Sequence, residues 1–159
     1  MTTRRGEGIR LGPWHQGAVY GATGVLVASG LAWLVMHYFL AQPGEFGEAL
    51  HPGEPWMLRI HGAGAMAGLV IYGSLLPIHI RRAWSLRRNI GLGIALVTLL
   101  LGLTLTGYLL YYAGGEESRP VISALHWVVG LAVPGLLAWH VVSGRRRTKH
   151  GWHRHTTPP

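Results

Sequence analysis

The chain of 159 residues contains no cysteine and little charge. Without cysteine it has no disulfides, no thiolate metal sites and no covalent C-x-x-C-H haem attachment, so any haem would be held by non-covalent ligation. Charged residues make up 13% of the chain, whereas hydrophobic residues make up 49% and occur in long blocks. This composition is too apolar for an ordinary soluble domain and favours one membrane domain.

Long apolar runs dominate the chain, and each is long enough to cross the hydrocarbon core of a bilayer. The runs cover residues 18–40, 56–80, 90–112 and 121–143. They leave a basic N-terminal segment (1–17) and a basic, histidine-rich tail (144–159) around one transmembrane domain (18–143). Because the second and third connections are short, neighbouring helices are expected to be antiparallel. The predicted fold class is all-α, an integral-membrane up-down four-helix bundle.

The net charge of +8 could indicate a nucleic-acid partner, but its distribution argues against one. Twelve of the fourteen Lys and Arg residues lie in the N-terminal segment, the 81–89 turn and the tail. Five of the six acidic residues lie on the opposite side. This asymmetry predicts a multi-pass membrane protein with both termini in the cytoplasm. Membrane lipids, and no nucleic acid, are the expected surroundings.

The ten histidines are an unusual number for so short a chain, and four of them fall into pairs within apolar runs. His126 and His140 are fourteen residues apart in the last run, which places them on nearly one helix face, roughly 21 Å apart. His61 and His79 are eighteen residues apart in the second run and also share a face. Imidazoles in membrane helices are costly without partners, so they indicate a functional site.

In an up-down bundle the second and fourth helices run in the same direction and would lie diagonally across the core. His61 would then face His126 at the outer level, and His79 would face His140 at the inner level. The spacings differ by one helical turn, which helix tilt or a bend at a proline in either helix could absorb.

Two imidazoles at matching depth on two helices suit a haem b with two axial histidines, and the pattern predicts two such haems. Gly64, Gly68 and Gly130 could let the macrocycle approach the helix backbone, and Arg59 could pair with a propionate. His15 and His37 remain as further candidate ligands.

Two alternatives keep a different role for the histidines. In the first, the protein is a haem-free membrane anchor or assembly subunit that tethers a soluble partner, and its interfacial histidines are merely hydrated. In the second, it transports metal ions. Zinc or copper sites usually want three or more clustered ligands, often with a carboxylate, and the predicted spans contain no Asp or Glu.

Two motifs resemble the bacterial membrane cytochrome b superfamily, which includes the dihaem b subunits of respiratory formate dehydrogenases and nickel–iron hydrogenases. The stronger one is HWVVGLAVPGLLAWH (126–140), whose H-x13-H spacing is similar to that of the family's dihaem helix. The weaker one is RIHG (59–62), which resembles the start of a histidine-bearing helix. The likeness in layout extends over about residues 12–145.

The resemblance implies that His126 and His140 ligate two stacked haems and that His61 partners His126. In formate dehydrogenase-type subunits the inner partner comes from the first helix, here His15, whereas the helical geometry above favours His79. His37 could line a quinone site or ligate an additional haem. The family likeness further implies an electron-transfer subunit, rather than a stand-alone enzyme, of a respiratory or photosynthetic-type oxidoreductase complex that exchanges electrons with membrane quinone and other subunits.

Overall fold

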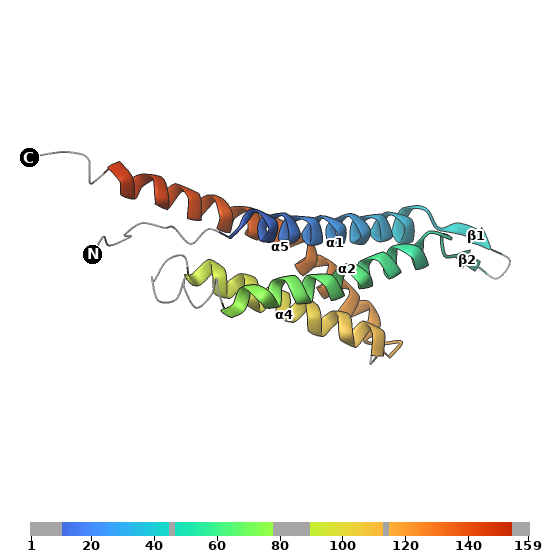
Figure 1. Ribbon diagram of the computed structural model, residues 1–159. Helices are drawn as coiled ribbons and strands as arrows, with labels where there is room; N and C mark the ends of the chain where they lie inside the picture. The colour runs from blue at the N-terminus through green and yellow to red at the C-terminus, as the bar shows by residue number, and fades with distance from the viewer. Residues whose placement is uncertain (1–10, 45–46, 78–89, 113–114, 154–159) are drawn as a thin grey trace, which may run out of the picture. The chain divides into compact units, whose positions relative to one another are not determined.

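The computed structural model describes residues 11–44, 47–77, 90–112 and 115–153 (Figure 1). Within them the chain forms four helices and a two-stranded antiparallel sheet. The elements are α1 (Pro13–Phe39), β1 (Gln42–Gly44), β2 (Gly47–Ala49), α2 (Glu54–Leu75), α4 (Ile90–Tyr112) and α5 (Arg119–His153). The predicted all-helical class is confirmed, and the small sheet, which lies in the expected 41–55 connection, is an addition to it.

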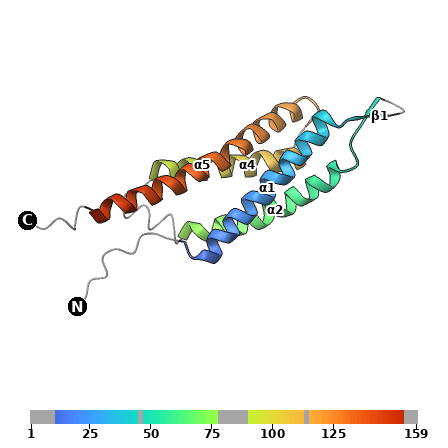
Figure 2. The ribbon, with the colours of Figure 1, turned by 90° about the horizontal axis from the view of Figure 1, so that it is seen from above.

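The chain divides into two compact units, each built on a pair of packed helices. The first hairpin contains α1, the small sheet and α2, and the second hairpin contains α4 and α5. In both views α1 runs alongside α2 (Figures 1 and 2).

The first hairpin is antiparallel along most of its length. Pro13 starts α1, where its missing N–H costs nothing, and the strand pair between Gln42–Gly44 and Gly47–Ala49 turns the chain back. The side-chain contacts between α1 and α2 run from His37–Glu54 through Ser29–His61 to Thr23–Tyr72. They follow eighteen residues of α2, roughly 27 Å of helix.

The second hairpin matches the predicted spans closely at α4 and less closely at α5. Helix α4 begins and ends at the predicted residues 90 and 112. Helix α5 begins at Arg119 and continues through the first ten residues of the expected tail to His153. Arg, Lys and His are tolerated in helices, and no proline interrupts the chain between Pro134 and residue 158, so the helix has no strong stop signal there.

Three helices of the described residues are long and apolar enough to cross a membrane: α1, α4 and residues 119–145 of α5. They indicate a membrane protein. Large apolar side chains stand exposed, such as Val70 (75% exposed), Leu101 (65%) and Val121 (62%), and such a surface is compatible with lipid contact. Helix α2 is less apolar because it carries Arg59, His61 and seven small glycine and alanine residues.

Few side chains are buried, since each hairpin is only two helices thick. Among the described residues the buried apolar side chains are Val19, Ala22, Leu96 and Val133. The buried polar ones are Ser29 and Glu54, which are 3% and 4% exposed. Each of these two contacts a histidine.

Candidate functional site

His61 is half-buried on α2 and lies against the backbone of α1. Its Nδ1 is 3.0 Å from the Oγ of the buried Ser29. A Cβ added to the adjacent Gly30 would lie 3.4 Å from the His61 Cε1, at the close end of ordinary van der Waals contact. The glycine therefore lets the imidazole approach α1, and the serine gives it a hydrogen-bond partner there.

His126 has the same surroundings in the second hairpin. Its Nδ1 is 2.8 Å from the Oγ1 of Thr106 on α4. A Cβ on the adjacent Gly107 would again lie 3.4 Å from the imidazole Cε1. Each hairpin thus places a hydroxyl–glycine dipeptide of its first helix against a histidine of its second.

This repeated pair of half-sites was missed by the sequence prediction. The signal in the sequence was the two dipeptides Ser29-Gly30 and Thr106-Gly107. Such dipeptides are common, however, and only the register of two antiparallel helices brings them opposite His61 and His126.

His140 also faces a glycine of α4, although less closely. It is half-buried, and a Cβ on Gly93 would lie 3.9 Å from its Cε1. Gly93 and Gly107 are fourteen residues apart, the same spacing as His140 and His126. Because the helices are antiparallel, equal spacing keeps both imidazoles of α5 against α4, and the predicted shared face of His126 and His140 agrees with this.

The other predicted ligands differ in their surroundings. His79 lies outside the described residues. His15 is exposed, near the start of α1. Arg59 is exposed, and its guanidinium carbon lies 4.9 Å from the centre of the Trp56 ring, a cation–π distance.

His37 lies in the last turn of α1 and contacts the buried carboxylate of Glu54. Its Nδ1–H donates to the Glu54 Oε2 over 3.1 Å, and the backbone N–H of His51 donates to the Oε1 over 3.3 Å. The His37 ring also stacks on Trp33, with ring centroids 4.6 Å apart. Helix α2 begins at Glu54, so its first residue carries a carboxylate. This residue lies two positions before the predicted span, which contains no acidic residue.

The three glycines predicted to line a cofactor all pack against the neighbouring helix of their own hairpin. A Cβ on Gly64 would lie 3.1 Å from the Val25 Cγ1, and one on Gly68 would lie 3.6 Å from the Leu26 Cδ1. A Cβ on Gly130 would lie 3.8 Å from Leu103. These glycines permit close helix approach, as small residues commonly do in membrane helices. Their contact with a macrocycle stays a prediction.

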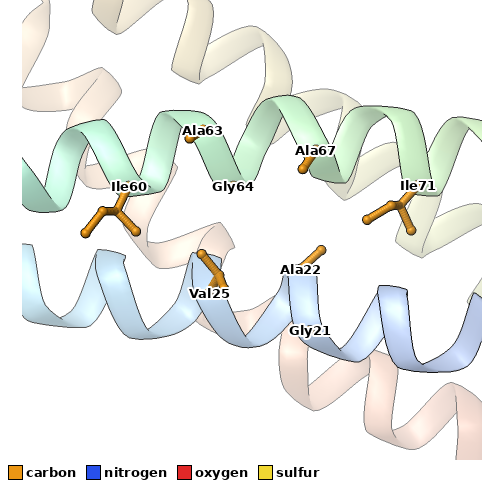
Figure 3. A pocket seen from close by; sticks show the side chains of 8 residues that line it. All are labelled: Gly21, Ala22, Val25, Ile60, Ala63, Gly64, Ala67 and Ile71. Carbon is orange, nitrogen blue, oxygen red and sulfur yellow. The ribbon is translucent and has the colours of Figure 1, made fainter. Parts of the chain in front are cut away.

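An apolar groove of about 420 Å³ runs between α1 and α2 (Figure 3). Its lining consists of Gly21, Ala22, Val25, Ile60, Ala63, Gly64, Ala67 and Ile71. None of these side chains offers a ligand or a proton, so the groove suits an apolar group and takes no part in metal ligation.

The histidines suit a metal cofactor whose iron needs only one protein ligand on each of its two faces. In the described part of the chain no three or more potential metal ligands lie in one cluster. A haem iron takes four nitrogens from its porphyrin and asks only for axial ligands. In His61 and His126 the contact with a hydroxyl engages Nδ1, the pattern in which Nε2 serves as the metal ligand. The chemistry of each half-site therefore fits one axial ligand of a haem iron.

Comparisons of the chain with models of protein families, with curated proteins and with solved structures find no match.

Proposed function

We propose that this protein is a transmembrane b-type cytochrome with two haems, which carries electrons across a bacterial inner membrane. The observation that supports it most is the pair of equivalent half-sites, in which His61 and His126 each have Nδ1 held by a hydroxyl of the neighbouring helix. Haem b bound by two imidazoles cycles between ferric and ferrous states and so carries one electron at a time.

The proposal includes four transmembrane helices. Helix α2 contacts α1 from His37–Glu54 to Thr23–Tyr72, roughly 27 Å of helix. A helix that follows a transmembrane neighbour over this length lies in the bilayer with it. The small residues and polar positions of α2 are then sheltered in part by α1, as at Gly64 and Gly68.

The outer haem would take His61 from the first hairpin and His126 from the second. The inner haem would take His140 together with His79, and His15 is the second candidate for that place. Arg59 would neutralise a propionate near the outer ligands. With the basic cytoplasmic side described above, both termini would lie in the cytoplasm.

The partners we propose are membrane quinone and the other subunits of a redox complex, similar to the formate dehydrogenase and hydrogenase complexes of the superfamily that the motifs resemble. The protein would be the electron-transfer subunit. His37 and Glu54 form the acid–base pair nearest to the outer end of the first hairpin, and they could exchange the protons that quinone chemistry requires.

The test is a reduced-minus-oxidised visible spectrum of the purified membrane protein, with haem quantified per chain. We expect two haems, and we expect His126→Ala to retain one. His51→Ala is the control, because His51 lies in the connection before α2 and should retain both. Two haems in His126→Ala would overturn the ligand assignment.

A second candidate function is the haem-free membrane anchor. In this case the hydroxyl–histidine contacts would only pack the helices of each hairpin together. Ser29 and Thr106 already satisfy Nδ1 of both histidines, so the imidazoles could serve only to pack the hairpins. A colourless protein, from cells that load a known haem b protein in parallel, would favour this anchor and refute the cytochrome.

A further inference from the structure

The hydroxyl of Ser29 determines which nitrogen of His61 carries the proton. The Ser29 Oγ donates its single proton to the Val25 carbonyl over 2.6 Å, a bond within α1. Having given that proton away, the Oγ can only accept from His61 Nδ1, 3.0 Å distant. Nδ1 is therefore the protonated nitrogen.

Thr106 does the same for His126. Its Oγ1 donates within α4, to the Gly102 carbonyl over 2.9 Å with the Leu103 carbonyl 3.2 Å away. It accepts from His126 Nδ1, 2.8 Å distant. Ser29 in the first hairpin and Thr106 in the second thus make the same contact with a histidine Nδ1. The repetition indicates that both histidines need a hydrogen-bond acceptor at this nitrogen.

We propose that Ser29 and Thr106 are positioning residues, which fix His61 and His126 as the Nδ1-protonated tautomer and so reserve Nε2 of each for an axial bond to iron. The tautomer follows from the geometry alone, whereas the role of Nε2 rests on the proposed function. A hydroxyl that accepts from Nδ1–H also raises the basicity of Nε2 and fixes the plane of the ring. Gly30 and Gly107 complete the half-sites, because the imidazole of each histidine lies against the glycine that follows its hydroxyl residue.

The first test needs no haem. Nitrogen NMR of the histidine-labelled protein in detergent reports which ring nitrogen is protonated. We expect Nδ1–H at both histidines, and we expect Thr106→Val to shift His126, and Ser29→Ala to shift His61, toward Nε2–H. The controls are Thr104→Val, whose hydroxyl bonds only within α4, and Thr23→Val, whose hydroxyl bridges α1 and α2 through Tyr72 without touching a histidine. An Nε2–H tautomer in the unaltered protein would overturn the proposal.

The second test uses the haem-loaded protein. Loss of the hydroxyl should weaken haem binding about 10- to 100-fold, the usual effect of removing a partner of a metal ligand. The ferric form should lose more, because it depends more on a basic ligand, so the reduction potential of one haem should rise by about 59 mV for each tenfold difference. Thr106→Ser keeps the hydroxyl and should restore both values.

The outcomes separate this proposal from the proposed function. Haem in the unaltered protein, with Ser29→Ala and Thr106→Val matching their controls in affinity and potential, would refute the positioning role and leave the cytochrome standing. Absence of haem together with the expected tautomers would refute the cytochrome and leave the hydroxyl–histidine pairs as packing contacts.

Discussion

At the scale of single residues, the protein places its scarce buried polar groups against histidines. Ser29 and Glu54 are the buried polar side chains of the described residues, and they hold His61 and His37 to the neighbouring helix. The sequence predicted that His61, His126 and His140 lie in long helices, and the structure places all three in α2 and α5. The sequence did not predict their partners, because the partner of His61 depends on the helix register, which the small sheet at Gln42–Ala49 sets and which no local pattern reveals.

The Glu54 carboxylate should be worth a measurable part of the stability of the first hairpin. Glu54→Ala removes two hydrogen bonds, each with a net contribution of about 0.5–1.5 kcal/mol, so the free energy of unfolding should fall by about 1–3 kcal/mol. Unfolding in mixed micelles, followed by circular dichroism, measures it. Glu116→Ala, at an exposed glutamate, is the control and should stay within about 0.5 kcal/mol. Equal effects of the two variants would mean that the His37–Glu54 contact contributes nothing.

At the scale of elements, the apolar pattern predicted the helices well where they are uniformly apolar and less well where they are not. Helix α4 covers the predicted residues 90–112, in which no charged residue interrupts the apolar run. Helix α2 begins two residues and ends five residues before the predicted bounds 56 and 80. Glu54 and Pro55 favour the first turn of a helix, an effect that the hydropathy pattern hides.

The two hairpins repeat the outer half-site but not the inner one. Fourteen residues after His61, where α5 has His140 after His126, α2 has Leu75. An inner ligand to match His140 must therefore come from outside the repeat, as His79 or His15 would. For this reason the inner haem that we propose would depend on one of those two residues, and single substitutions of each would show which one it uses.

Gly62 and Gly64 are two residues apart on α2, but only Gly64 packs against α1, so substitutions at the two positions test the packing of the two helices. A side chain at Gly64 meets Val25 of α1, whereas one at Gly62 meets nothing within 4 Å. We expect Gly64→Val to cost about 1–3 kcal/mol through overpacking. Gly62→Val should be neutral or slightly stabilising, because glycine is a poor helix former. The midpoint of unfolding in mixed micelles measures both. Equal midpoints would show that α1 does not approach α2 at Gly64.

At the scale of the whole molecule, the decisive element is α2, because it fixes the number of membrane crossings. Three crossings, by α1, α4 and α5, would put the two termini on opposite sides. Four crossings put both in the cytoplasm, as the distribution of Lys and Arg favours. The contacts of α2 along α1, from Glu54 to Tyr72, favour four, since an antiparallel partner cannot leave the bilayer while it stays packed.

Reporter fusions separate the two topologies at three places. With four crossings, a fluorescent protein fused after residue 88 or at the C-terminus should fluoresce, because it stays in the cytoplasm. A phosphatase that folds only outside the cytoplasm should be active after residue 116. With three crossings all three results are inverted. A fusion after residue 50 is the control, because it follows α1 alone and lies outside in both cases. Inverted results would also displace His61 and His79 from the membrane. The outer haem would then lose its proposed partner for His126, and the inner haem would be left with His15 as the candidate partner of His140.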